Sequence, residues 1–244
     1  MTTPPGSADV TNGAAATDES PDRFGDNYHG TMAKHLVWDW NGTLLDDFHA
    51  VVTASSDAVI ALGGIGLDAD THRERFRRPL SAFYNELLGR ELTAIEFDRL
   101  NDLFHNRYRD QLADCRLSAG AIEAIGTWRG TQSLLSMWRH DELVPLVTEH
   151  GLFDYFTRVD GLRDNADVGK HQYLVDHLAQ LNIEPTDTVM IGDSADDAEA
   201  AEAAGASCVL VTGGTTSRRL LAATGFPVAD SLLEAVRLAQ PSTT

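Results

Sequence analysis

The sequence is poor in positive charge and has no long apolar run. Its 19 Lys and Arg residues are outnumbered by 37 Asp and Glu residues, which gives a net charge of −18 at pH 7. A chain this acidic repels phosphate backbones, so we expect no nucleic-acid partner. No apolar run approaches the roughly 18 residues of a membrane helix, and the N-terminus lacks the basic and apolar regions of a signal peptide. We therefore expect a cytoplasmic protein without a membrane partner.

Cysteine and lysine are also scarce. The two cysteines, Cys115 and Cys208, lie far apart and have no partner spacing, which argues against both a disulfide framework and a zinc site. We expect them to be reduced core residues. Lys34 and Lys170 are the only lysines of the chain. This scarcity draws attention to Lys170, which falls at the start of a helical pattern.

Two segments at the ends of the chain have little to bury. Residues 1–33 consist largely of Thr, Ser, Gly, Ala, Pro and Asp, and we predict a disordered tail because burial cannot offset the entropy of ordering it. Residues 240–244 are expected to be frayed. The rest of the chain has the composition of an ordinary globular protein, with 43% hydrophobic and 23% charged residues overall.

Short apolar runs alternate with helical patterns along the globular part. The runs are residues 35–39, 133–137, 157–161, 188–193 and 207–213. Strands that are buried on both faces and separated by helices are typical of a parallel sheet covered on both sides. The sequence therefore predicts an α/β fold with a doubly wound parallel sheet.

No convincing strand is found between the first and second apolar runs. Residues 50–62 and 93–112 show helical periodicity instead, and Thr93 with Glu96 forms a capping-box pattern. We predict that residues 48–115 form an all-helical cap subdomain, inserted above the C-terminal strand ends where such sheets bind ligands. Residues 34–47 and 116–239 would then form the α/β core.

Acidic residues follow two of the apolar runs. Asp39 ends the first run in DWNGTLLDD, and Asp193, Asp196 and Asp197 follow the fourth run in GDSADD. Two carboxylate clusters at the ends of parallel strands repel each other unless a cation lies between them, and oxygen-only ligands favour Mg²⁺. Favourable charge at a helix N-terminus is the alternative explanation for Asp196 and Asp197.

The order of these motifs resembles the haloacid dehalogenase superfamily, specifically its phosphoglycolate-phosphatase-like branch with a helical C1 cap. DWNGTLLDD at residues 39–47 is similar to the DxDGTLxD motif, and GDSADD at residues 192–197 to GDSxxD. The run that ends at Ser136 and the isolated Lys170 stand where the second and third motifs fall. The resemblance covers residues 35–235. It implies a Mg²⁺-dependent phosphatase acting on a small phosphorylated metabolite. Both a monomer and a homodimer are compatible with the sequence.

The resemblance also implies roles for single residues around the metal. Asp39 would be the nucleophile that becomes an aspartyl-phosphate. Asp39, the backbone carbonyl of Asn41 and Asp193 would hold Mg²⁺. Asp197 would orient the water shell of the metal.

Three further residues would bind the phosphoryl group according to the resemblance. Ser136 would donate a hydrogen bond together with the backbone N–H of Met137, and Lys170 would supply a fixed positive charge. The alternative explanations are an ordinary strand-end turn for Ser136 and a solvated helix-start lysine for Lys170.

Two arginines of the cap are candidate substrate ligands. Arg77 and Arg78 fall where cap residues of this branch face the site, and a guanidinium there would favour a second anionic group on the substrate. A solvated helix face paired with Glu74 is the alternative explanation, and it is the one we favour.

Asn41 departs from the family pattern, which has an Asp two positions after the nucleophile to protonate the leaving group and activate water. An amide does neither, so we expect breakdown of the aspartyl-phosphate to suffer and an Asp at position 41 to speed turnover of poor leaving groups. A phosphotransferase or a weakly active pseudophosphatase is therefore an alternative to the phosphatase. A 2-haloacid dehalogenase is a further alternative, but its metal-free site would not need the acids of GDSADD.

Overall fold

The computed structural model describes Met1, residues 33–163 and residues 169–240. The predicted tail and the predicted frayed end lie outside the described residues, apart from Met1, Ala33 and Gln240. The described chain from Ala33 onward belongs to one compact unit. Within these described ranges, no helix has both the length and the apolar character that crossing a membrane requires.

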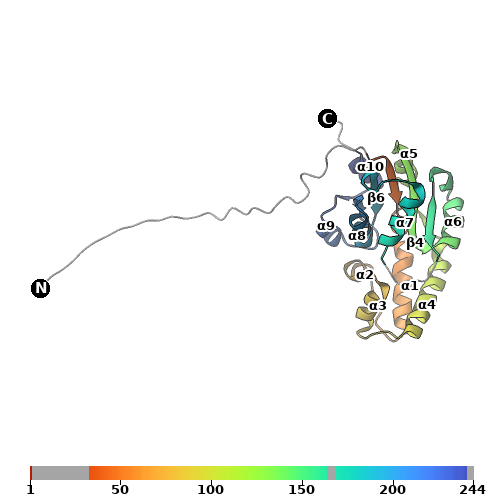
Figure 1. The fold of residues 1–244 in the computed structure, drawn as a ribbon. Helices are drawn as coiled ribbons and strands as arrows, with labels where there is room; N and C mark the ends of the chain where they lie inside the picture. Colours follow the sequence, from red (N-terminus) through yellow and green to blue (C-terminus); the bar gives the residue numbers. More distant parts are fainter. Residues whose placement is uncertain (2–32, 164–168, 241–244) are drawn as a thin grey trace. The chain divides into compact units, whose positions relative to one another are not determined.

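Six parallel strands form the central sheet (Figure 1) in the order β5-β4-β1-β6-β7-β8. The strands are β1 (His35–Trp38), β4 (Thr131–Arg139), β5 (Val159–Leu162), β6 (Thr188–Gly192), β7 (Ser207–Val211) and β8 (Val228–Ala229). Their pairings are all parallel, and β1 is central because it pairs with both β4 and β6. The five predicted runs supply five of these strands. The sixth, β8, has only two residues and leaves no pattern in the sequence.

Helices cover both faces of the sheet, as predicted for a doubly wound fold. Leu36 and Trp38 of β1 belong to one hydrophobic cluster, while Val37 between them belongs to another, because successive side chains of a strand point to opposite faces. The first cluster includes residues of α5 (Ala121–Thr127), α6 (His140–Glu149) and α10 (Leu232–Ala239). The second includes residues of α7 (His171–Leu181), α8 (Ala195–Ala204) and α9 (Arg218–Ala223). Two short 3-10 helices are η1 (Phe153–Tyr155) and η2 (Pro185–Asp187).

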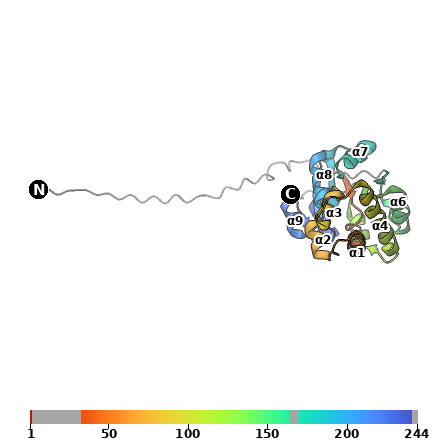
Figure 2. The same ribbon diagram turned by 90° about the horizontal axis from the view of Figure 1, so that it is seen from below.

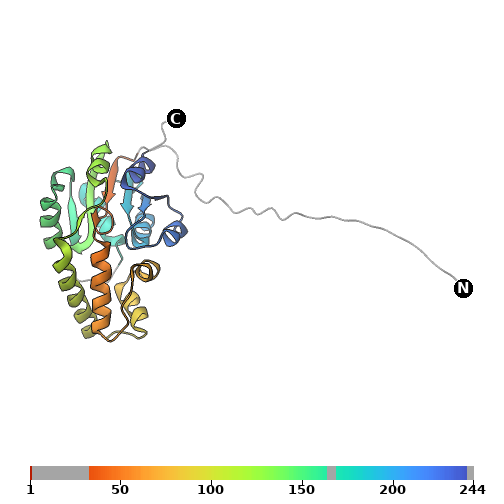
Figure 3. The same ribbon diagram turned by 180° about the vertical axis from the view of Figure 1, so that it is seen from behind.

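Four helices lie between β2 (Leu45–Asp46) and β3 (Arg116–Leu117) in the chain and form a helical insert. They are α1 (Phe48–Ala61), α2 (Ala69–Arg75), α3 (Leu80–Leu88) and α4 (Ala94–Leu112). Figure 3 shows them together below the sheet, beyond the ends of its strands, and Figure 2, the view from below, shows them in front of it; α1 packs alongside α4. Their interior includes Val59, Phe83 and Leu100, which form a cluster separate from the two clusters of the sheet. The predicted capping box of Thr93 and Glu96 opens α4.

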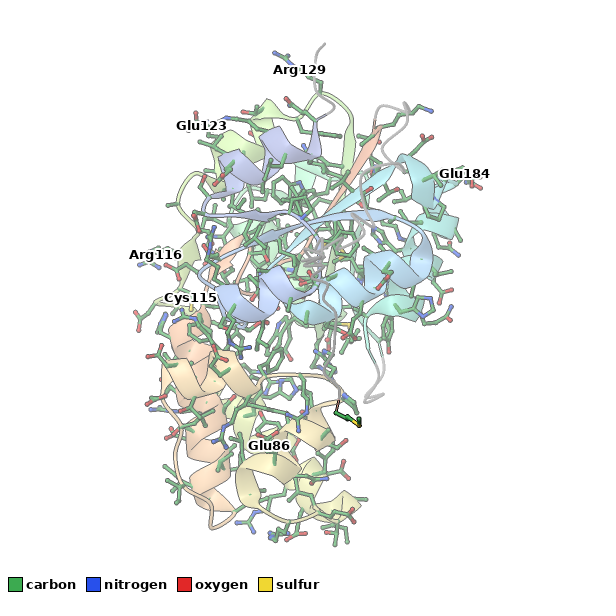
Figure 4. The ribbon with its side chains drawn as sticks, turned by 90° about the vertical axis from the view of Figure 1, so that its left-hand side faces the viewer. Glu86, Cys115, Arg116, Glu123, Arg129 and Glu184 are labelled. Atoms are coloured by element: carbon green, nitrogen blue, oxygen red, sulfur yellow. The ribbon has the colours of Figure 1, made fainter. Side chains whose placement is uncertain are left out.

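A short antiparallel pair joins this helical insert to the sheet. It consists of β2 (Leu45–Asp46) and β3 (Arg116–Leu117), which pair on either side of the four helices. The sequence analysis found no strand here because two-residue strands carry no periodicity. Cys115 lies where the chain returns from the insert (Figure 4), and Cys208 lies in β7. Both are buried and free, in agreement with the prediction.

Candidate active site

Three buried carboxylates meet at the C-terminal edge of the sheet. Asp39 directly follows β1, Asp193 directly follows β6, and Asp197 lies in the first turn of α8. One oxygen of each lies within 4.8 Å of the others. Because β1 and β6 are adjacent and parallel, their C-terminal ends reach the same edge. The structure therefore brings together the two acidic motifs that are about 150 residues apart in the chain.

The turn after β1 is shaped by Gly42, which lies against Asp193. Gly42 has a φ of 70°, and a Cβ at this position would lie 2.5 Å from Oδ2 of Asp193. Only glycine suits both the backbone conformation and the close approach. From the opposite side, Thr215 donates to the same oxygen from its backbone N–H at 2.5 Å and from its hydroxyl at 2.7 Å. The sequence analysis missed Thr215, although the Gly-Gly turn before it follows an apolar run.

Lys170 links two of the three carboxylates. It is the N-cap residue of α7 and is only 1% exposed, so it is not the solvated lysine of the alternative interpretation. Its Nζ donates to Oδ1 of Asp39 and to Oδ1 of Asp197, the latter at 2.7 Å. Burial acts to lower the pKa of Lys170, but Asp197 and Asp39 raise the pKa above its ordinary value. The amine therefore stays charged.

The carboxylates of Asp39, Asp193 and Asp197 can carry three negative charges, whereas Lys170 carries one positive charge. Burial raises the pKa of Asp39 well above its ordinary value, with Lys170 opposing and Asp197 and Asp193 adding to the rise. Burial and the charge of Asp197 raise the pKa of Asp193 to about 7. A cation among these oxygens would lower both pKa values. The donor set is oxygen only, which fits Mg²⁺ rather than a softer metal.

Residues at the start of α8 cap this helix and also belong to, or contact, the carboxylate cluster of Asp39, Asp193 and Asp197. The hydroxyl of Ser194 donates to Oδ2 of Asp197 at 2.7 Å, and the two residues form a capping box. Asp197 thus combines the role expected at a helix N-terminus with a place in the cluster. Asp196 accepts from the backbone N–H of Lys170 at 3.1 Å and pairs with Arg78 at 3.2 Å.

Asn41 is fixed by hydrogen bonds at both ends of its amide. The hydroxyl of Ser136 donates to Asn41 Oδ1 at 3.0 Å. Asn41 Nδ2 donates to Oδ2 of Asp47 and to the hydroxyl of Tyr108, each at 2.8 Å. Tyr108 in turn donates to Asp47, which is completely buried. The sequence analysis assigned no role to Asp47 or Tyr108, because their contact depends on the packing of α4 against the turn after β1.

A cavity of about 180 Å³ lies between the carboxylates and the helical insert. Met137 and Arg78 line this cavity, together with Asp39, Asn41 and Lys170. Arg77 does not line it, but pairs with Glu86 among the helices of the insert (Figure 4). Glu74, the partner expected for the arginine cluster, pairs with Arg219 instead.

Two comparisons of the amino-acid sequence find proteins that are similar to this chain. The HAD-hydrolase-like family matches residues 168–235. A phosphoglycolate phosphatase of Chromobacterium violaceum is 28% identical over 187 residues, which cover 73% of this chain and 84% of the relative. The chain therefore resembles haloacid dehalogenase-like hydrolases. The family match includes Lys170, Asp193 and Asp197, while Asp39 and Asn41 precede it in the sequence.

Solved structures share the fold of this chain. A haloacid dehalogenase-like hydrolase of Streptococcus pneumoniae superposes with a TM-score of 0.73 at 18% identity, over 85% of this chain and 98% of the other. A hydrolase of Pseudomonas syringae superposes with a TM-score of 0.72 at 18% identity, over 84% and 96% of the two chains. Because the superpositions cover 85% and 84% of this chain, the shared fold extends over most of the described residues.

Proposed function

We propose that the protein is a Mg²⁺-dependent phosphatase that hydrolyses the phosphomonoester of a small metabolite. The observation that carries this proposal is the buried Lys170, which bridges Asp39 and Asp197 beside Asp193 in the wall of a cavity. This arrangement offers a nucleophilic carboxylate, a fixed positive charge and oxygen ligands for a cation within one site. The phosphoglycolate phosphatase of Chromobacterium violaceum supports the same reaction class.

Asp39 carries the covalent step of the proposed mechanism. One of its carboxylate oxygens attacks the phosphorus in line, and the bond from phosphorus to the leaving oxygen breaks with its electron pair on that oxygen. The product of this step is an aspartyl-phosphate. Water then attacks the phosphorus, which releases inorganic phosphate and restores the Asp39 carboxylate.

The phosphoryl oxygens need fixed donors during both steps. Lys170 already lies beside Asp39 and supplies a positive charge that needs no reorganisation. The backbone N–H of Met137, on the neighbouring strand β4, would also donate to the phosphoryl group, and so would Ser136 once its hydroxyl turns away from Asn41. Asn41 is held in place between Ser136 and Asp47, so that the turn after Asp39 keeps one conformation.

The proposed metal ligands are Asp39, the backbone carbonyl of Asn41 and Asp193, with Asp197 orienting the water shell. Mg²⁺ bound there would neutralise part of the charge of an anionic nucleophile meeting an anionic phosphate. Burial and the neighbouring carboxylates raise the pKa values of Asp39 and Asp193, which supports this assignment because a bound cation would offset both effects. Dehalogenation would not need this concentration of acids.

Asn41 favours a second candidate function, that of a phosphotransferase. Its amide cannot take a proton from water, so hydrolysis of the aspartyl-phosphate lacks the base that the family pattern places there. An acceptor alcohol would then compete with water for the phosphoryl group. The ratio of alcohol released to phosphate released separates the two functions: it is one for a phosphatase and exceeds one for a transferase with an acceptor present.

A screen of phosphorylated metabolites with Mg²⁺ and phosphate detection tests the proposal. We expect at least one substrate whose turnover stops in excess EDTA and in the Asp39→Asn variant. Asp57→Asn, which changes an exposed acid of α1, is the matched control and should keep full activity. Turnover that survives EDTA or the Asp39→Asn change would contradict the mechanism.

A further inference from the structure

Aromatic side chains from two groups of residues line the cavity beside the proposed catalytic residues. In the first group, Phe104 and Tyr108 of α4 stack with ring centroids 5.9 Å apart, and Trp138 of β4 lies 4.6 Å from Tyr108. In the second group, His72 of α2 stacks on Phe76 at 5.2 Å. All five side chains line the cavity. A planar, apolar group packs against such side chains better than a charged one.

The positive charges that line this cavity all have acidic partners. Among the described lining residues, Arg78 pairs with Asp196 at 3.2 Å, and Lys170 bridges Asp39 and Asp197. Arg139 pairs with Asp141 and Glu142, each at 3.3 Å.

The two lining histidines add no positive charge at pH 7. Burial lowers the pKa of His72 to about 4, and burial followed by Arg109 lowers the pKa of His105. A carboxylate on the leaving group would therefore be buried without a cation of its own, which is unfavourable.

The size of the cavity limits the leaving group. Its volume is about 180 Å³, and an engineered apolar cavity of about 150 Å³ holds a benzene molecule. The two volumes are similar, so a single ring is the size of group that this cavity can hold.

Asn41 restricts the leaving group independently of the cavity. An amide supplies no titrating proton, so the leaving oxygen must depart without protonation from this residue. A phenol loses its proton near pH 10, as tyrosine does, and is therefore a far better leaving group than an aliphatic alcohol. The chemistry of Asn41 and the shape of the cavity point to the same kind of leaving group.

We propose that the substrate is an aryl monophosphate, the phosphate ester of a small phenol that carries no charge on its ring. This inference rests on the proposed phosphatase function and assigns its substrate class. The ring would pack against the aromatic side chains that line the cavity, such as Phe104 and Phe76, with its phosphate toward Asp39 and Lys170.

Two pairs of substrates test the proposal. In the first pair, 4-ethylphenyl phosphate and 4-(carboxymethyl)phenyl phosphate have leaving groups of similar acidity and differ in charge. We expect kcat/KM for the uncharged ester to be at least about tenfold higher. In the second pair, phenyl phosphate should be hydrolysed at least about 100-fold faster than cyclohexyl phosphate, which has the same size but a poor leaving group. Equal rates, or a preference for the carboxylated or cyclohexyl ester, would overturn the proposal.

A charge placed in the wall should reverse the preference for uncharged esters. Asn101 on α4 lines the cavity, and Asn101→Arg should raise kcat/KM for the carboxymethyl ester relative to the ethyl ester by at least about tenfold. Asn106→Arg, on the exposed side of the same helix, is the matched control and should leave the ratio unchanged. An unchanged ratio in Asn101→Arg, with the fold retained by circular dichroism, would count against a ring bound at this wall.

Binding of phosphonates separates this inference from the phosphatase proposal. The phosphonate analogues of the first pair cannot be hydrolysed, and with Mg²⁺ the ethyl compound should raise the melting temperature more than the carboxymethyl compound. If this preference is found but no ester is hydrolysed, the substrate class stands and the phosphatase proposal fails. If esters are hydrolysed and the carboxymethyl compounds are preferred in both assays, the phosphatase stands and the substrate class is wrong.

Discussion

The side-chain amide of Asn41 donates to the buried carboxylate of Asp47 at 2.8 Å. The other oxygen of Asp47 accepts the backbone N–H of Gly42 at 2.7 Å, so the carboxylate holds the turn that follows Asp39. Burial raises the pKa of Asp47, while the hydrogen bonds from Tyr108, Asn41 and Gly42 lower it. An acid at position 41 would face this carboxylate directly. We therefore expect an Asp at position 41 to speed turnover only when Asp47 is replaced as well.

Moving the carboxylate from position 47 to position 41 tests whether these two side chains interact. Asn41→Asp places two carboxylates at hydrogen-bond distance, and we expect it to lower the free energy of unfolding by about 1–3 kcal/mol. The double variant Asn41→Asp/Asp47→Asn should recover most of this loss and should speed hydrolysis of alkyl phosphates by tenfold or more. Urea unfolding and a leaving-group series measure the two effects. Additive destabilisation in the double variant would show that the two side chains do not interact.

The two lysines provide a matched comparison. Lys170→Met leaves Asp39 and Asp197 buried without their cation, and we expect it to destabilise the fold by about 3–5 kcal/mol. Lys34→Met removes a pair with Asp187 in which the lysine side chain is 68% exposed, and it should cost less than about 1 kcal/mol. Urea denaturation at pH 7 without added metal measures both. Equal effects would contradict the assigned environment of Lys170.

Metal binding should be visible without any substrate. Because Mg²⁺ would bind the folded state alone, a concentration of about 100 times Kd should stabilise the protein by about 2.7 kcal/mol. Asp193→Asn should abolish most of this gain, whereas Asp57→Asn on the surface should keep it. Thermal unfolding with and without Mg²⁺ provides the measurement. The same Mg²⁺ effect in both variants would place the metal elsewhere.

His35 should make the fold sensitive to acid. Burial, followed by the neighbouring His177, lowers the pKa of His35 to about 4. The unfolded chain then binds this proton near pH 6.5 and the folded chain only near pH 4, so the stability contributed by neutral His35 is complete above about pH 6.5. About 3 kcal/mol is lost as the pH falls to 4.

Substitution of His35 isolates this contribution. In His35→Asn, the loss of unfolding free energy between pH 7 and pH 4.5 should be about 2 kcal/mol smaller than in the wild type. His49→Asn, on an exposed position of α1, should show the wild-type pH dependence. If the unfolding free energy of His35→Asn depends on pH as it does in the wild type, another group controls the response to acid.

Periodicity and motif order determined much of the architecture. The apolar runs at 35–39 and 188–193 predicted β1 and β6, because strands buried on both faces leave uninterrupted hydrophobic segments. The Thr93 and Glu96 pattern predicted the start of α4, because a capping box is a local interaction. The adjacency of Asp39 and Asp193 also followed from the sequence, since the C-terminal ends of parallel strands share an edge.

Contacts between distant segments were decided by tertiary structure alone. Whether Arg77 or Arg78 reaches the cavity depends on the path of the chain between α2 and α3, and adjacent residues of that segment end in different environments. Tyr108 meets Asp47 because α4 packs beside the turn after β1, a relationship that no local pattern records. Hydrophobic patterning determines which face of an element is buried, but the partner of a buried polar group is set by how those elements pack.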